Sequence, residues 1–142
     1  MPPEDAQQIW LESAVGDAGA WLLPPTTTVN SPHPLLIFGH GHAELIHHWP
    51  EAFDEPRSWG VAVLLVEYPG YGASKGAPSE ESIIETFQAA YDWAIEQGNV
   101  DAKRIIGYGR SLGGGAVAGL SRKRQLAALI LESTFTSTRP FA

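Results

Sequence analysis

The sequence predicts an α/β fold, a three-layer α/β/α sandwich on a mostly parallel sheet, formed as a single domain over residues 1–142. Two observations predict it. Four continuous apolar runs follow one another along the chain, and segments with helical patterning lie between them. Strands and helices that alternate in this way form parallel sheets with right-handed crossovers. An antiparallel hairpin is expected to precede them at the N-terminus.

The N-terminal hairpin is predicted from two short apolar segments, Ile9–Ser13 and Ala20–Leu23, with a turn at Val15–Gly19. Pro24 and Pro25 end the second strand, because proline has no N–H to donate to a neighbouring strand. These two strands form the antiparallel part of the predicted sheet.

Four apolar runs predict the parallel strands, and their unbroken hydrophobic character is typical of strands that are buried on both faces. The runs are Leu35–Phe38, Val61–Val66, Arg104–Tyr108 and Leu126–Leu131. In open α/β sheets, functional residues gather at the carboxyl ends of the strands. The residues expected at this edge of the sheet are His40, Glu67, Ser111 and Glu132.

Three helices are predicted between these strands. The clearest is Ser79–Gln97, in which Ser79 is a good N-cap and the apolar residues form one face. Leu112–Ser121 is a second helix, rich in glycine and alanine, which suits close packing on a sheet. A third helix is expected between Ala43 and Gly60, where two prolines leave its ends undefined.

Composition narrows the classes of function. The chain is 44% hydrophobic and 18% charged, which is enough apolar content for a buried core, and it has no cysteine for disulfides, thiolate metal sites or catalysis. A net charge of −7 argues against a nucleic-acid partner. No apolar run approaches the ~20 residues of a membrane helix, and the N-terminus does not resemble a signal peptide. We therefore expect no membrane association and a cytoplasmic location.

A nucleophile elbow is predicted at Gly109-x-Ser111-x-Gly113, between an apolar strand and a helix. A serine on so sharp a turn needs small residues two positions away on each side, where a side chain would clash. The backbone amide of Leu112, at the start of the helix, is then placed to stabilise an oxyanion. The alternative is that Ser111 is only a helix N-cap.

The loop after the first parallel strand is expected to supply the second oxyanion donor. Here that loop contains His40, Gly41 and His42. Gly41 permits close approach of the backbone, and the amide of His42 is the predicted donor. For the His40 side chain a structural role in holding the loop is favoured over a role as general base.

Four segments carry a resemblance to a known family, and they are, in chain order, Leu35–His42, Glu67–Gly76, Gly107–Gly114 and Leu131–Phe135. Together they resemble the α/β-hydrolase superfamily. More narrowly, they look like its bacterial esterase-like and serine aminopeptidase-like members, which are related to the prolyl oligopeptidase catalytic domain. The resemblance extends over nearly the whole chain from about Ile9. Glu67 is a departure, because the family more often has aspartate there.

The resemblance implies a serine hydrolase. Ser111 would attack an ester, thioester or amide carbonyl of a small acyl substrate, with a histidine as base and an acid to orient it. An acyl-enzyme forms and water releases it. The resemblance implies neither a cofactor nor a metal ion.

The resemblance also implies parts that residues 1–142 do not contain. The family has eight strands in the order 1-2-4-3-5-6-7-8, with the acid after the seventh and the histidine after the eighth. Leu126–Leu131 corresponds to the sixth, and no histidine follows His48. We therefore expect a truncated hydrolase fold of about six strands, inactive or very weak by itself. Leu126–Leu131 becomes an edge strand, through which self-association is expected.

Three other interpretations stay open. One is that His42, His47 or His48, oriented by Glu132, replaces the absent base. Another is that the chain is a non-catalytic α/β module that binds an acyl ligand or a partner. A nucleotide-binding fold is the third, but Gly107-x-Gly109-x-x-Leu112 lacks the third glycine of the usual pattern.

Overall fold

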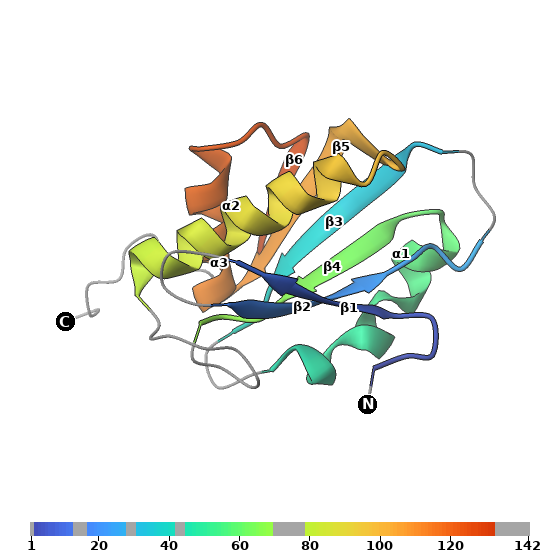
Figure 1. Cartoon of the computed structure of the whole chain (residues 1–142), viewed down its shortest axis with the longest axis horizontal. Coiled ribbons are helices and arrows are strands. Elements are labelled where there is room, and N and C mark those ends of the chain that lie inside the picture. Colours follow the sequence, from blue (N-terminus) through green and yellow to red (C-terminus); the bar gives the residue numbers. More distant parts are fainter. Residues whose placement is uncertain (1, 13–16, 28–30, 42–44, 70–78, 133–142) are drawn as a thin grey trace.

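The computed structural model describes residues 2–12, 17–27, 31–41, 45–69 and 79–132, and these form a single twisted sheet with helices on both faces (Figure 1). The strand order in the sheet is β1-β2-β4-β3-β5-β6. The strands are β1 Gln7–Leu11, β2 Ala18–Leu23, β3 His33–Gly39, β4 Ala62–Val66, β5 Val100–Arg110 and β6 Ala128–Glu132. This confirms the predicted fold class and the predicted order of the strands.

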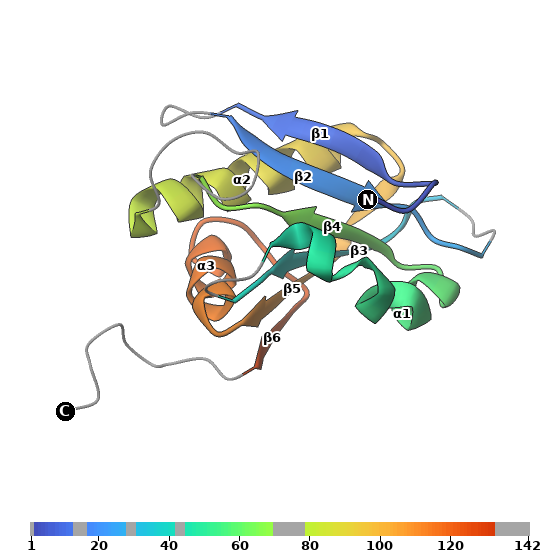
Figure 2. The same ribbon diagram turned by 90° about the horizontal axis from the view of Figure 1, so that it is seen from below.

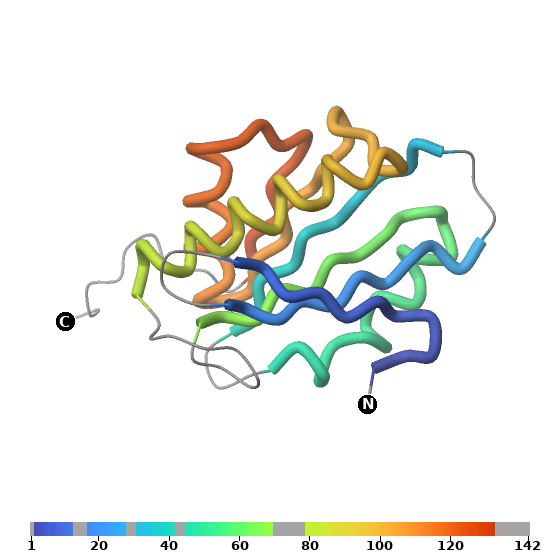
Figure 3. Tube along the Cα trace, viewed as in Figure 1, coloured from blue at the N-terminus to red at the C-terminus, as the bar shows by residue number. Residues whose placement is uncertain are grey.

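Strand directions also agree with the prediction. β2 pairs antiparallel with both β1 and β4, whereas β3 pairs parallel with β4 and β5, and β6 pairs parallel with β5. Figure 3 traces how β3 and β5, far apart in the sequence, lie side by side. The carboxyl ends of these parallel strands therefore meet at one edge of the sheet, with Gly39 opposite both Val66 and Gly109.

Helices α2 (Glu80–Glu96) and α3 (Leu112–Ser121) cover one face of the sheet. The opposite face carries η1 (Ile46–His48), η2 (Pro50–Phe53) and α1 (Asp54–Ser58), as Figure 2 shows. β3 is buried on both faces: Leu35 and Ile37 join the core beneath α2 and α3, and Leu36 and Phe38 join the other core. In the described part of the chain, no helix is long and apolar enough to cross a membrane.

Helix α2 begins as the sequence predicts. The Ser79 hydroxyl accepts a hydrogen bond from the Ser82 N–H at 3.0 Å, and the Ser82 hydroxyl accepts one from the Ser79 N–H at 2.9 Å. This reciprocal pair satisfies two backbone donors that the first turn leaves without acceptors. Beyond the helix, Gly98 adopts a φ of 76°, a conformation that glycine adopts without strain.

Several boundaries differ from the prediction: β1 begins at Gln7 rather than Ile9, and β5 begins at Val100 rather than Arg104. In the described residues 45–60, where one helix is predicted, the structure has two short 3₁₀ turns and a helix of five residues, because Pro50 and Pro56 interrupt the backbone hydrogen bonding. The last strand starts at Ala128, two residues later than predicted. Leu126 is instead partly buried against the core beneath α2 and α3.

Candidate active site

The turn between β5 and α3 holds Ser111 in an unusual backbone conformation. Its φ is 53° and its ψ is −116°, and no other non-glycine residue in the described ranges has a positive φ. Such a conformation costs about 1–3 kcal/mol and persists only where the surrounding structure enforces it. A strained serine between a strand and a helix is the geometry of a nucleophile elbow.

Glycines enforce this turn by permitting close backbone contacts. A Cβ atom on Gly109 would lie 2.2 Å from the carbonyl oxygen of Gly113, and one on Gly113 would lie 1.9 Å from the carbonyl oxygen of Gly39. No side chain fits at either position. The helix after Ser111 therefore sits directly against the end of β3, which brings the elbow beside the loop that begins at His40.

The Ser111 hydroxyl does not cap helix α3, so the structure does not support Ser111 as a simple side-chain N-cap. The Ser111 N–H donates to the Glu132 carbonyl at 2.8 Å, and the Ser111 carbonyl accepts from the Gly114 N–H at 2.9 Å. Leu112 is the first residue of α3, where an N–H has no acceptor within the helix. This amide is adjacent to the serine. Because it makes no hydrogen bond within the helix, it can donate to another acceptor.

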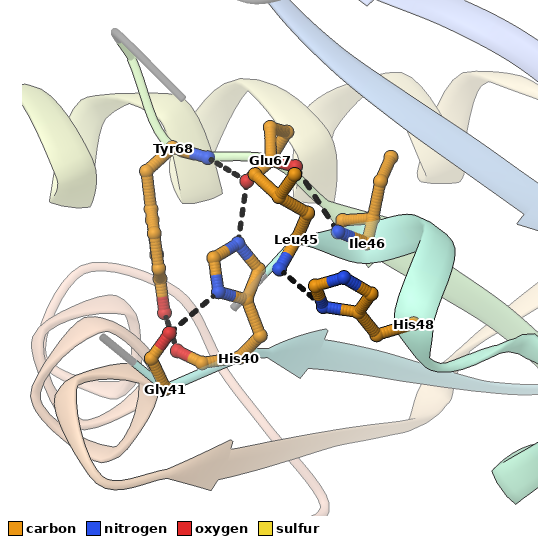
Figure 4. Close-up of polar contacts among 7 residues, drawn as sticks. All are labelled: His40, Gly41, Leu45, Ile46, His48, Glu67 and Tyr68. Atoms are coloured by element: carbon orange, nitrogen blue, oxygen red, sulfur yellow. Dashed lines mark hydrogen bonds and ion pairs between the residues drawn. The ribbon is translucent and has the colours of Figure 1, made fainter. Parts of the chain in front are cut away.

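His40 directly follows β3 (Figure 4), and it is completely buried. Its Nδ1 is 2.8 Å from the carbonyl oxygen of Gly41, and its Nε2 is 2.5 Å from Oε1 of Glu67. The imidazole therefore ties the end of β3 to the end of β4. These contacts agree with the structural role that the sequence favours for His40.

Glu67 and Tyr68 complete this buried network. The Glu67 carboxylate also accepts from the Tyr68 N–H at 3.2 Å and from the Ile46 N–H at 3.0 Å. The Tyr68 hydroxyl donates to the carbonyl oxygen of His40. The sequence identifies Glu67 as a strand-end residue but not as the partner of His40. The strand order contains that signal, since Gly39 pairs with Val66 and the next residues are His40 and Glu67.

The structure describes two of the three histidines that the sequence offers as substitute bases. His47 and His48 lie in η1, where His48 Nδ1 accepts from the Leu45 N–H at 3.0 Å. Both line a surface hollow together with Pro3, Pro50, Glu51, Asp54 and Arg57. In the part of the chain that is described, neither histidine makes a hydrogen bond to Ser111 or Glu132. His42, the third of these histidines and the predicted oxyanion donor, lies outside the described residues, as do residues 133–142.

Glu132, at the end of β6, has partners other than histidine. Its Oε2 accepts from the Tyr108 hydroxyl at 2.8 Å, and its Oε1 lies 3.5 Å from Nε of Arg110. Burial of the Tyr108 ring and the hydrogen bond to Glu132 both raise the pKa of Tyr108. The Arg110 guanidinium also lies over the Trp49 ring, 5.4 Å from its centroid. Among the described residues, Tyr108 and Arg110 thus hold the Glu132 carboxylate.

Comparison with known proteins identifies relatives that are longer than this chain. Residues 45–128 match the family model described as "Chlamydia CHLPS protein (DUF818)". The α/β-hydrolase domain-containing protein WAV2 of Arabidopsis thaliana is 36% identical over 134 residues, which are 92% of this chain and 43% of WAV2. The chain spans about two fifths of the length of several curated relatives that it matches.

Solved structures share the fold. The α/β hydrolase GrgF from Penicillium sp. sh18 superimposes with a TM-score of 0.80 at 22% identity, over 94% of this chain and 46% of GrgF. The α/β serine hydrolase XC6422 from Xanthomonas campestris has a TM-score of 0.76 at 17% identity, over all of this chain and 67% of XC6422. The family match covers more than half of the chain, and the fold agrees with it. The chain belongs to the Chlamydia CHLPS protein (DUF818) family, and its fold is that of the α/β hydrolases.

Proposed function

We propose that this chain carries the nucleophile of a serine hydrolase that cleaves ester, thioester or amide bonds through an acyl-enzyme at Ser111. The observation that carries the proposal is the strained conformation of Ser111 between β5 and α3. Strain of this kind has no structural benefit of its own, and it is maintained by two glycines that no other residue could replace. Its effect is to present the serine hydroxyl at the carboxyl edge of the sheet.

In this proposal the tetrahedral intermediate is stabilised by two backbone amides. One is the N–H of Leu112, which starts α3 and has no acceptor in the helix. The other is the N–H of His42, which follows the segment that His40 and Glu67 hold in place. The positive end of the α3 macrodipole adds to the stabilisation of the developing negative charge.

The proposal assigns no general base within residues 1–142, because no histidine follows His48 in the sequence. Loss of a triad member costs about 10⁴–10⁶ in kcat, and oxyanion binding alone leaves about 10³–10⁴ over water. We therefore expect these residues by themselves to turn over esters very slowly. In the complete hydrolase, the base and its acid are proposed to come from sequence beyond this chain, as the greater length of the relatives suggests.

The test is covalent labelling by a fluorophosphonate, with the labelled residue located by peptide mass spectrometry. We expect Ser111 to label slowly, but at least about tenfold faster than Ser121, an exposed serine at the other end of α3, because only Ser111 lies beside oxyanion donors. Ser111→Ala removes the label and Ser121→Ala retains it. In urea-unfolded chain the two serines should label equally, since the elbow is lost.

Chemical rescue tests the absent base directly. Free imidazole, added at increasing concentration, should accelerate the labelling of Ser111 because it supplies the proton acceptor that the triad normally provides. The rate at Ser121 serves as the control. Equal rates at Ser111 and Ser121, with or without imidazole, would contradict the catalytic proposal and favour the non-catalytic binding module.

A further inference from the structure

The hydrogen bonds of His40 require one more proton than a neutral histidine carries. Nδ1 lies 2.8 Å from the carbonyl oxygen of Gly41, which only accepts, so this nitrogen is protonated. Nε2 lies 2.5 Å from Oε1 of Glu67 (Figure 4). A neutral imidazole has a single N–H. A second proton must therefore lie between Nε2 and Oε1, either on the ring or on the carboxyl group.

The backbone around Glu67 decides between these two locations. Oε1 also accepts from the Tyr68 N–H, and Oε2 accepts from the Ile46 N–H. Donors to both oxygens stabilise an ionised carboxylate. A protonated Oε1 would have to donate to His40 and accept from Tyr68 at the same time. We infer that His40 and Glu67 form a buried imidazolium–carboxylate pair, and that this pair positions the Gly41 carbonyl.

Burial makes such a pair persistent. His40 and Glu67 are both buried, and the Tyr68 ring packs against the imidazole with centroids 4.3 Å apart. A buried ion pair is tolerated where the two charges cancel and each polar atom has a partner. Removal of either charge leaves the other buried and uncompensated, which costs far more than an exposed charge would.

The pair acts on the chain beyond its own residues because a trans peptide is planar. The imidazolium donates to the Gly41 carbonyl oxygen, and the same peptide unit carries the N–H of His42. That N–H is the second oxyanion donor of the proposed function, and this step of the inference rests on that function. His40 is therefore a positioning residue, and with both ring nitrogens engaged it is not the general base.

Nuclear magnetic resonance of the folded chain tests the charge state without any need for activity. In ¹⁵N-labelled protein near neutral pH, His40 should show one-bond N–H correlations at both ring nitrogens, because burial slows their exchange with water. The signals are assigned by their loss in His40→Gln. In Glu67→Gln, which keeps the size of the side chain but removes its charge, the Nε2 proton should disappear. A single ring N–H in the wild-type chain, or two in Glu67→Gln, would overturn the inference.

Positioning is tested by the labelling of Ser111. His40→Gln, which removes the Nδ1–H that donates to the Gly41 carbonyl, should slow the reaction by about tenfold to a hundredfold, the range expected when an oxyanion donor is displaced. The matched control is Tyr91→Phe, which also removes a hydrogen bond, from the Tyr91 hydroxyl to the Gln125 carbonyl at 2.9 Å, but away from β3. Unchanged labelling in folded His40→Gln would overturn the positioning role.

These results separate this inference from the proposed function. If the wild-type chain labels no faster at Ser111 than at Ser121, the proposed function fails. The N–H correlations of the His40 ring still determine the charge state of His40. In that case positioning is judged from the carbonyl carbon resonance of Gly41, which should shift in Glu67→Gln because its hydrogen bond from His40 changes. A resonance at the wild-type position would overturn the inference.

Discussion

At the scale of single residues, close contacts between three glycines hold Ser111 in place. Gly113 lies against the carbonyl oxygen of Gly39, and Gly109 lies against the carbonyl oxygen of Gly113. Gly115 is two residues beyond Gly113 in α3 and has open space where a Cβ would lie. A side chain is therefore excluded at Gly109 but has room at Gly115, six positions later in the sequence.

Alanine at Gly109 and at Gly115 should change stability in opposite directions. Gly109→Ala forces a Cβ to within 2.2 Å of backbone, which has to shift, so we expect a loss of about 3 kcal/mol or more in the free energy of unfolding. Gly115→Ala should add about 0.5–1 kcal/mol, because alanine is the better residue inside a helix. Urea denaturation of both variants measures the difference. Equal stabilities would contradict the contact geometry.

The elbow was predictable from residues and the His40–Glu67 contact was not. Ser111 lies within a local motif, and the small residues that the turn requires are two positions away on each side. His40 and Glu67 are separated by 26 residues, and they meet only because β4 lies beside β3 in the sheet. Local patterns predict turns and helices, whereas contacts between strands depend on sheet order and register.

At the scale of elements, α2 and the segment after α3 are joined by side chains at their surface. Asp92 of α2 accepts two hydrogen bonds from the Arg124 guanidinium, each 2.8 Å long. These bonds lower the pKa of Asp92 and raise the pKa of Arg124. Burial raises the pKa of the neighbouring Tyr91. The bidentate geometry fixes the end of α3 relative to α2.

This ion pair should stabilise the fold in a pH-dependent way. Because the native pKa of Asp92 is below its usual value, its contribution is complete above the unfolded pKa near 3.8 and is lost as pH falls through the native value. The Asp92 side chain is 51% exposed, so we expect at most about 1 kcal/mol. The measurement compares the unfolding free energies of wild type and Asp92→Asn at about pH 7 and about pH 2.

The difference between wild type and Asp92→Asn should be present at the higher pH and close to zero at the lower one. Arg124→Gln is the matched control, because it removes the partner and should remove the same pH dependence. A difference that stays constant with pH would show that Asp92 acts by something other than its charge.

The sequence predicts the presence of the strands and helices more accurately than the residues at which they begin and end. The continuous apolar runs and the Ser79 cap identify the strands and α2 because the necessary signals are local. β5 begins at Val100, earlier than its apolar run, because pairing of His33 with Val100 extends it. The segment between Ala43 and Gly60 is the least predictable from local sequence, since its prolines remove helix hydrogen bonds and its path depends on the tertiary packing of Ile46 and Phe53.

At the scale of the whole molecule, the sheet has two different edges. β1 is at one edge and β6 at the other. All residues of β6 are exposed, and its apolar body includes Leu129, Ile130 and Leu131 at 39%, 44% and 48% exposure. Unpaired strand edges with apolar side chains readily pair with other chains. We propose that this edge is the surface through which the chain associates with itself.

A lysine in the middle of β6 should prevent this association. Wild-type chain at high micromolar concentration should show dimers or larger species by light scattering, and Ile130→Lys should be monomeric, because a charge on an edge strand opposes pairing. Trp10→Lys is the matched control, since Trp10 is exposed to a similar degree on β1 at the opposite edge. A monomeric wild-type chain, or an effect of Trp10→Lys equal to that of Ile130→Lys, would contradict the assignment to β6.

The position of β4 in the sheet constrains the order in which the chain can fold during synthesis. β4 lies between β2 and β3 but is made after both of them. A nascent chain that ends before Ala62 has two apolar strands that do not pair with each other, because both require the same absent neighbour. The central sheet forms only when β4 leaves the ribosome and joins them. Until then β2 and β3 are the segments of the growing chain that most need protection from aggregation.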